Sequence, residues 1–295
     1  MERTLIGLSR MTRSQKVVLN TRRTLIYIIL TILALLCLFP VFEVITNMTR
    51  STGAIATSIG FWFGDKLVEN WTGTFARTSF KMDKAIMNSL IVAFASATLS
   101  TYFSALTAYG LQVYNFKGSR AIFTFILVIM MIPTQVSAVG FVDMMTKMGA
   151  KNTLWPLFIP SICSPVVFFY MKQYMESVLP MEMIEAARVD GASEIRIFHQ
   201  MILPIIVPAI AVQFIFAFVG SWNNLLVPSL LLDGGPNFQT IPIVVAAFND
   251  RSNPQTFDLG QVYVVIFLAI IPLLVIYLFC SRFIIKGMTE GSVKG

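Results

Sequence analysis

Long apolar runs recur along the chain and determine its predicted architecture. A helix needs about 20 predominantly apolar residues to cross the hydrocarbon core of a bilayer. The apolar runs predict six such helices, at residues 24–46, 85–111, 121–143, 154–174, 203–232 and 260–285. The fifth run is longer than one crossing requires, and we expect its prolines, Pro204, Pro208 and Pro228, to interrupt or tilt it. The predicted fold is therefore all-α and embedded in a membrane.

The polar segments between the apolar runs divide the chain. We expect a basic N-terminal arm at residues 1–23, a first helix with a long outer segment at 24–84, a five-helix core at 85–285 and a C-terminal tail at 286–295. The outer segment contains Trp62 and Trp71, which are typical of short helices at a membrane interface. In the last long connection, the apolar stretch 240–248 predicts a short helix that dips toward the membrane or caps a cavity.

The distribution of lysine and arginine predicts the orientation of the chain. Cytoplasmic loops of membrane proteins carry an excess of both residues. An even number of crossings places the C-terminus on the same side of the membrane as the N-terminal arm. Most of the 22 lysines and arginines in this chain fall on that side. They are Arg3, Arg10, Arg13, Lys16, Arg22, Arg23, Lys117, Arg120, Lys172, Arg188, Arg196, Arg282, Lys286 and Lys294. Both ends are therefore expected to be cytoplasmic.

The composition is typical of a membrane protein, and the motifs that are absent exclude several kinds of catalytic and metal site. The mean hydropathy is +0.74 and only 13% of residues are charged, whereas soluble domains hold about 25% charged residues. The net charge of +7 fits the anionic cytoplasmic leaflet rather than a nucleic acid. None of the 17 glycines begins the phosphate-binding pattern G-x-x-x-x-G-K-S/T, and a single histidine excludes the H-E-x-x-H zinc motif. We therefore expect no catalytic residues, no metal and no bound cofactor.

Ionisable side chains, which a proton relay would require, are almost absent from the apolar runs. Glu43 is the main exception, and it lies near the outer end of the first run, where its side chain can reach the interface. The chain therefore shows neither a site for ATP hydrolysis nor a proton relay. If it transports a solute, a separate subunit has to drive the transport.

A polar segment, EAARVDGASEIRIFHQMILP at residues 185–204, stands between the fourth and fifth apolar runs. Its pattern predicts a helix opened by Pro180, a left-handed turn at Gly191 and a second helix capped by Asp190 or Ser193. We expect the second helix to bury Ile195, Phe198 and Ile202, and to expose Ser193, Glu194, Arg196 and His199 on a solvated face. On this interpretation, replacing Glu194 with alanine is nearly silent.

The same segment resembles the EAA loop of the membrane subunits of ATP-binding-cassette (ABC) importers. That pattern is E-A-A, three residues, G, nine residues, I, one residue and L-P, and here Met201 replaces the isoleucine. Three other stretches are similar to the carbohydrate branch of this family, in particular to its maltose-type second permease. They are NSLIVA at 88–93, FVGSWNNLLVP at 218–228 and RFIIKGMTEGSVKG at 282–295.

The resemblance implies a type I ABC importer transmembrane-domain fold with six helices in a bacterial plasma membrane. It implies a homologous second permease, two ATPase subunits that bind ATP and magnesium, and an extracytoplasmic binding protein that delivers a sugar such as an oligosaccharide. It further implies that the loop at 175–204 fits a cleft on the ATPase and converts ATP-driven closure into helix movement. The coupling residues that the motif implies are Glu185, Ala186, Ala187, Asp190, Gly191, Ser193, Phe198, Leu203 and Pro204.

Two further groups of residues are candidates for function. Trp222, Asn223 and Asn224 place an indole and two amides in an apolar run, where polar groups are costly unless they face water or a partner. They suit sugar rings and hydroxyls on a translocation path, or hydrogen bonds to the second permease. In the tail, Lys286, Gly287 and Lys294 are candidates for contact with the ATPase.

Two alternative functions stay open at the level of the sequence. The first is an ABC permease for a polyamine, an amino acid or a peptide, against which the sugar-like SWNN stretch and tail argue. The second is a polytopic membrane enzyme or a secondary carrier. The absence of catalytic clusters and of charge within the apolar runs argues against it.

Overall fold

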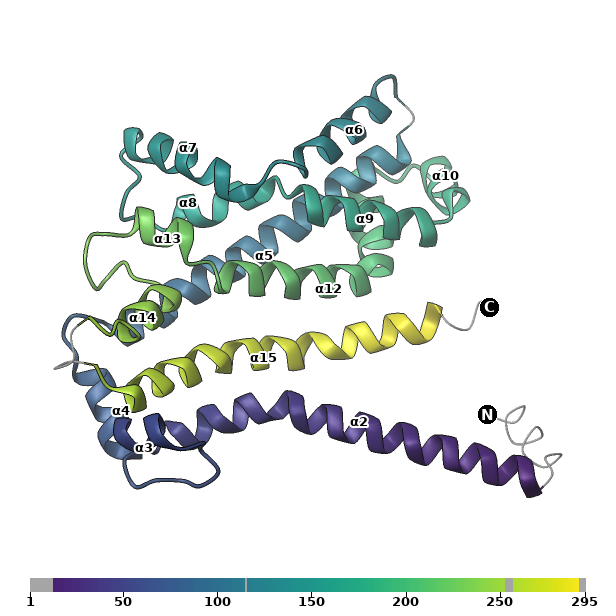
Figure 1. The fold of residues 1–295 in the computed structure, drawn as a ribbon. Helices are drawn as coiled ribbons and strands as arrows, with labels where there is room; N and C mark the ends of the chain where they lie inside the picture. The colour runs from purple at the N-terminus through teal and green to yellow at the C-terminus, as the bar shows by residue number, and fades with distance from the viewer. Residues whose placement is uncertain (1–12, 115, 253–256, 292–295) are drawn as a thin grey trace. The chain divides into compact units, whose positions relative to one another are not determined.

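The computed structural model describes residues 13–114, 116–252 and 257–291 (Figure 1). Every regular element in these ranges is helical, and no strand occurs in them. The chain forms two compact units, one of residues up to 70 with 258–264 and one of residues 71–257 with those from 265 onward. The first unit contains α2 (Arg13–Asn47), α3 (Thr52–Thr57) and the beginnings of α4 (Leu67–Ala76) and α15 (Leu259–Gly291).

The second unit contains the remaining helices of the described chain. They are α5 (Met82–Val113), α6 (Ser119–Ile129), α7 (Thr134–Lys147), α8 (Trp155–Phe158), α9 (Pro165–Val178), α10 (Met181–Val189), α11 (Glu194–Ile197), α12 (Leu203–Trp222), α13 (Leu226–Leu231) and α14 (Ile241–Phe248). A 3-10 turn at Ile159–Ile162 follows α8, and a π-helical turn at Phe198–Ile202 joins α11 to α12.

Four of the described helices are long and apolar enough to cross a membrane. They occupy Asn20–Asn47, Met82–Val113, Glu194–Trp222 and Leu259–Ser281, and they agree with the first, second, fifth and sixth predicted spans. α6 and α7 provide a fifth span if they count as one, although they are bent by 93° at the break between them. The expected all-α membrane fold is thus confirmed.

Prolines explain why the third and fourth predicted spans are not continuous helices. Pro133 precedes α7, and its ring disfavours the helical conformation at Ile132, so the chain bends there. In the fourth span, Pro156, Pro160 and Pro165 each lie at the start of a short element. Proline is tolerated at that position because the first N–H groups of a helix have no partner within it.

The fifth span is interrupted beside only one of its three prolines. α12 contains both Pro204 and Pro208 and ends at Trp222, and α13 follows with Pro228 inside it. Pro204 has no N–H to donate to the carbonyl of Gln200, and the π-helical turn before it absorbs this loss without a break. The interruption falls between α12 and α13, just before Pro228 in the first turn of α13, so Pro228 lies beside a break whereas Pro204 and Pro208 do not interrupt the helix.

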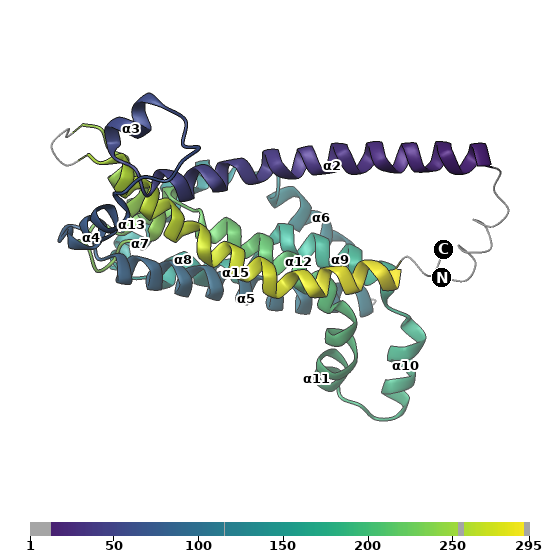
Figure 2. The same ribbon diagram turned by 90° about the horizontal axis from the view of Figure 1, so that it is seen from below.

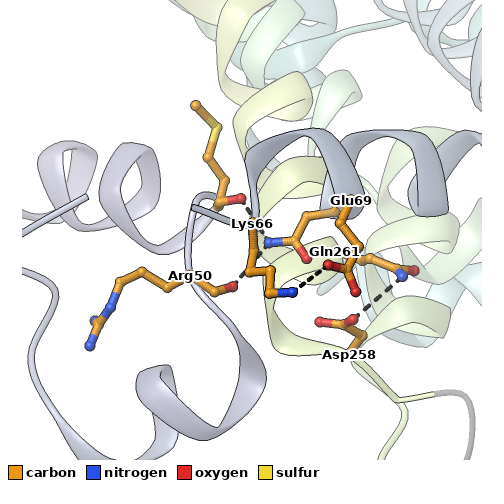
Figure 3. A network of polar contacts seen from close by, with 7 residues as sticks. Arg50, Lys66, Glu69, Asp258 and Gln261 are labelled. Carbon is orange, nitrogen blue, oxygen red and sulfur yellow. Dashed lines mark hydrogen bonds and ion pairs between the residues drawn. The ribbon is translucent and has the colours of Figure 1, made fainter. Parts of the chain in front are cut away.

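Buried polar side chains organise the first unit beyond the end of α2. The guanidinium of Arg50 donates hydrogen bonds to Asn47 Oδ1 at 2.8 Å and to the Ala54 carbonyl at 2.9 Å. The Asn70 amide donates to the carbonyls of Met48 and Arg50 (Figure 3). Figure 3 also shows the ion pair of Lys66 with Glu69 and the contact of Gln261 with Asp258.

Glu43 belongs to the same unit. Its carboxylate accepts hydrogen bonds from the Asn47 amide at 2.9 Å and from the Gly60 N–H at 3.1 Å. A side chain at Gly60 would overlap the Asn47 amide, so this approach requires glycine. Glu43 therefore helps to fix the fold of the outer segment, and its position at the interface stays a prediction.

α5 is the centre of the second unit and packs along α9 and α12 (Figure 1). Its fully buried residues are alanines, namely Ala85, Ala93, Ala97, Ala105 and Ala108. Small side chains let helix backbones approach closely, which favours association where lipid removes the hydrophobic driving force. α14 confirms the short helix expected at 240–248, and its Ile241 N–H donates to the Ser89 hydroxyl of α5 at 2.8 Å.

Candidate functional site

The polar segment between α9 and α12 forms a helical hairpin. Figure 2 shows α10 and α11 projecting together from the ends of α9 and α12. Gly191 has a φ of +77°, and its N–H donates to the Arg188 carbonyl while the Ala192 N–H donates to the Ala187 carbonyl. These two bonds are the pattern of a Schellman motif, which ends a helix at a left-handed residue. The predicted glycine elbow is therefore present.

The second helix of the hairpin begins at Ser193, which has an extended backbone but makes no capping hydrogen bond with its side chain. Asp190 instead ends α10. Ile197, Phe198 and Ile202 are buried within the second unit, whereas Ile195 is 75% exposed. The expected burial of Ile195 is therefore wrong, because the face that packs is set by contact with α5 and α10 rather than by spacing alone.

The tip of the hairpin is open to a partner. Of the coupling residues that the motif implies, Glu185, Ala186, Asp190, Gly191, Ser193 and Pro204 are exposed, Leu203 is half-buried, and Ala187 and Phe198 are buried. Val189 is 88% exposed. In the sequence it precedes the elbow at Gly191, and the exposed Ile195 follows it. The sequence analysis did not predict that Val189 and Ile195 are exposed. The pattern that could have indicated it is two large apolar side chains flanking a glycine in a charged segment. Exposed apolar groups rimmed by charge mark interaction surfaces.

Glu194 holds the hairpin together. Its carboxylate accepts a hydrogen bond from Arg188 Nε of α10 at 2.7 Å and one from the Tyr109 hydroxyl of α5 at 2.7 Å. The Arg188 guanidinium also lies 5.4 Å from the centre of the Tyr114 ring. The hydrogen bond to Glu194 raises the pKa of Arg188 further above its ordinary value, so the pair is an ion pair at any physiological pH.

Glu194 thus connects α10, α11 and α5 at a single carboxylate. The expectation that it lies on a solvated face is wrong, and we therefore no longer expect its replacement by alanine to be silent. Spacing along one helix could not reveal the contact, because Tyr109 stands 85 positions earlier in the chain. His199, expected on the same solvated face, is exposed but also bonded, to the Ile195 carbonyl through Nδ1 and to the Tyr102 hydroxyl through Nε2.

The three residues expected on a translocation path do not share one site. Trp222 is 2% exposed, its ring stacks on Phe218, and its indole N–H donates to the Ala269 carbonyl at 3.1 Å. With Asn223 it borders an apolar cavity of about 470 Å³, whereas Asn224 borders a separate polar cavity. Trp222 is therefore buried with its polar group satisfied, and a role for these three residues on a translocation path stays a prediction.

The tail residues are only partly placed. Lys286 and Gly287 belong to the backbone of α15, and the structure describes no side chains there. Lys294 lies outside the described residues. Contact of this tail with an ATPase stays a prediction.

Comparison with known proteins agrees with the resemblance of the hairpin to the EAA loop. Residues 100–290 match the family described as binding-protein-dependent transport system inner membrane component. The chain is 34% identical to the arabinooligosaccharides transport system permease protein AraQ of Halalkalibacterium halodurans, over 70% of this chain and 73% of that protein. It is 32% identical to the maltodextrin transport system permease protein MdxG of Bacillus subtilis, over 70% of this chain and 74% of that protein.

A solved structure shares the fold. A chain of a bacterial ABC transporter involved in the import of the acidic polysaccharide alginate superposes with a TM-score of 0.74, covering 92% of this chain and 98% of that one at 20% identity. The family match spans most of the second unit and includes the hairpin. The chain therefore belongs to the family of binding-protein-dependent transport system inner membrane components, the permease subunits of ABC importers.

Proposed function

We propose that this chain is the permease subunit of an ATP-driven importer that carries a sugar, such as an oligosaccharide, across the bacterial plasma membrane. The observation that carries the proposal is that several similar permeases are named for the sugars they transport. Permeases for arabinooligosaccharides, maltodextrin and lactose each align with at least 70% of this chain. A phosphorylated polyol is the second candidate, because an sn-glycerol-3-phosphate permease protein of Brucella abortus is 29% identical over 84% of the chain.

The proposed importer has further subunits. A homologous second permease completes the membrane domain, two separate ATPase subunits hydrolyse ATP, and an extracytoplasmic binding protein delivers the sugar. The binding protein is supported by a likeness in fold, at a TM-score of 0.58, to a bacterial alginate ABC transporter in complex with an alginate pentasaccharide-bound periplasmic protein. Both ends of this chain are proposed to lie in the cytoplasm, where the basic residues gather.

The hairpin is the proposed coupling element. Glu185 and Asp190 offer exposed charge, and Val189 and Ile195 offer exposed apolar area, to a cleft on the ATPase. Movement of that cleft reaches α12 directly, because α11, the π-helical turn and α12 are consecutive helical segments. It reaches α5 through the bond from the Tyr109 hydroxyl to Glu194.

The test is uptake by the complete importer in lipid vesicles. We expect ATP-dependent uptake of a labelled arabinooligosaccharide or maltodextrin in the presence of the binding protein, and none of putrescine or an amino acid. Uptake of sn-glycerol-3-phosphate in place of sugars would favour the second candidate. Uptake that needs neither ATP nor the ATPase subunits would overturn the assignment to an importer driven by separate subunits.

A further inference from the structure

A polar groove lies in the middle of the second unit. Its volume is about 370 Å³. α5 lines it with Ser96 and Ser100, the broken segment before α9 with Ser161 and Ser164, and α12 with Gln213 and Ser221. We call this feature the serine groove. It exists because the fourth predicted span is broken at this point, so that a 3-10 turn rather than a continuous helix faces α5.

The serine groove lies deep within the membrane-crossing helices. Gln213 is close to the midpoint of α12, and Ser96 and Ser100 are close to the midpoint of α5. With a rise of about 1.5 Å per residue, Gln213 is about 15 Å from either end of α12. That depth corresponds to the centre of a hydrocarbon core about 30 Å thick. Asn224, which also lines the groove, lies just beyond the end of α12, so the groove runs from the bilayer centre toward one surface.

Gln213 is a largely buried polar side chain of the groove with no hydrogen-bond partner in the described chain. It is 6% exposed, it lines the groove, and its amide makes no hydrogen bond with any residue that the structure describes. An amide offers two donors and an oxygen acceptor. The amide atoms of Gln213 are not among the buried ones that lack a partner, because they open into the groove, where a molecule in the groove can bond them. A polar group retained there inside a membrane indicates that something outside this chain satisfies it.

The chemistry of the groove wall selects the kind of ligand. None of the residues that line it is ionisable, so the wall offers no counter-charge to a phosphate, an amine or a carboxylate. It offers hydroxyls: Ser161 donates to the Ser96 carbonyl at 3.2 Å, and Ser221 donates to the Ser96 hydroxyl at 3.2 Å, which leaves oxygen lone pairs free to accept. Val166 and Phe216 add exposed apolar surface suited to the C–H face of a sugar ring.

We propose that the serine groove is a binding site in this permease for a neutral sugar during its passage, with Gln213 as the residue that hydrogen-bonds the sugar hydroxyls. This inference rests on the proposed function and replaces Trp222 and Asn223 as path residues, because the indole N–H of Trp222 is already bonded. Transporter sites near the bilayer midplane, formed where a helix is broken, are a general solution to moving a polar solute.

The first experiment uses the complete importer in vesicles with a Gln213→Leu variant, which removes the donors and the acceptor and keeps the side chain's bulk. We expect its maximal rate of sugar uptake to fall about tenfold, as for the loss of hydrogen bonds worth about 1.4 kcal/mol. The ATPase rate without sugar and the permease abundance should not change. Thr107→Ala is the control on the same helix, because the Thr107 hydroxyl donates to the Phe103 carbonyl one turn earlier in α5 and Thr107 does not line the groove. It should transport within about twofold of the wild type.

The second experiment does not depend on the Gln213 variant folding. A single cysteine is placed at Asn224 in a cysteine-free permease, and its reaction with a small thiol reagent is followed in the assembled complex during ATP turnover. The transported sugar should slow this reaction at least threefold, and a sugar that is not transported should leave it unchanged. A rate independent of sugar would mean that a side chain of the second permease, rather than sugar, fills the groove.

The outcomes separate the two proposals. A wild-type complex that takes up no sugar overturns the proposed function and the groove assignment together. A wild-type complex that takes up sugar, beside a Gln213→Leu complex of equal abundance and equal uptake, overturns the groove assignment alone.

Discussion

At the scale of single residues, the hairpin depends on one backbone conformation and one carboxylate. Gly191 supplies the positive φ that turns α10 into α11, and Glu194 ties both helices to α5. Gly191 is exposed at the tip and Glu194 is half-exposed. Both determine where the exposed surface of the tip is held.

Replacing Gly191 tests the conformation alone. A side chain there would meet no atom of this chain within 4 Å, so any effect on the fold of the hairpin comes from the φ of +77° and not from crowding within the chain. Gly191→Val should cost about 1–2 kcal/mol, while Gly191→Asn should cost less because asparagine enters the left-handed region more readily. We expect Val to lower the ratio of sugar transported to ATP hydrolysed, with Asn in between. Normal coupling by Gly191→Val at normal abundance would show that the hairpin is only a connector.

Replacing Glu194 tests the contact between the hairpin and α5. Glu194→Ala leaves Arg188 and the Tyr109 hydroxyl without their acceptor, at a cost of about 1–2 kcal/mol after allowing for solvent at a half-exposed ion pair. Uptake should fall at least threefold. Glu194→Gln should restore most of it, because its one amide oxygen can still accept from Arg188 while its amide N–H can donate to the Tyr109 hydroxyl oxygen. Glu176→Ala removes an exposed ion pair with Lys172 and serves as the control. Equal uptake by the alanine and wild-type forms would contradict the anchoring role.

At the scale of elements, the junction from α11 to α12 decides how motion of the hairpin is passed on. The π-helical turn at Phe198–Ile202 lies directly before Pro204, and it buries Phe198 and Ile202. A π-helical turn holds one residue more than the equivalent α-helical turn, which rotates the helices on either side of it by about 100°. The turn therefore sets which face of α11 meets α5 and which residues remain at the tip.

Pro204→Ala tests this junction. Alanine restores the missing N–H and removes the ring, so the segment can tighten to an α-helix and rotate α11 relative to α12. We expect less ATPase activity coupled to the binding protein, with unchanged or higher thermal stability. Pro208→Ala, at a proline inside α12 with no π-helical turn before it, should retain coupling. Similar behaviour of the two variants would show that the π-helical turn has no special role.

At the scale of the whole molecule, the proposed topology depends on how many segments cross the membrane. The described chain contains four helices that meet the length and hydropathy of a span, or five with the bent pair, and the fourth predicted run is broken into shorter pieces. The proposed topology, with both ends inside, places α3 and the loop before α14 outside and the hairpin inside.

Single cysteines in a cysteine-free permease test this topology. Ser58 and Asn237 are exposed and proposed to be outside, and Val189 is 88% exposed and proposed to be inside. A membrane-impermeant thiol reagent added to intact cells or spheroplasts should label the first two positions and spare Val189→Cys until the membrane is opened. Labelling of Val189→Cys in sealed spheroplasts would reverse the orientation.

The sequence by itself determined the features that depend on neighbouring residues. Four of the predicted spans, the glycine elbow and the short helix at Ile241–Phe248 follow from local hydropathy and local backbone preference, and the structure contains them. The EAA pattern was likewise readable, because its residues are close together in the chain. Exposure of the hairpin's acidic tip followed from its charge.

The tertiary structure alone decided which polar groups have partners. Glu194 meets Tyr109, and Trp222 meets the Ala269 carbonyl, across separations that no local pattern encodes. Gln213 stands apart because no described residue bonds its amide and it faces a groove formed by three segments distant in sequence. The physical reason is that a buried polar side chain gains or loses free energy according to the groups packed against it, and packing brings those groups together from the whole length of the fold.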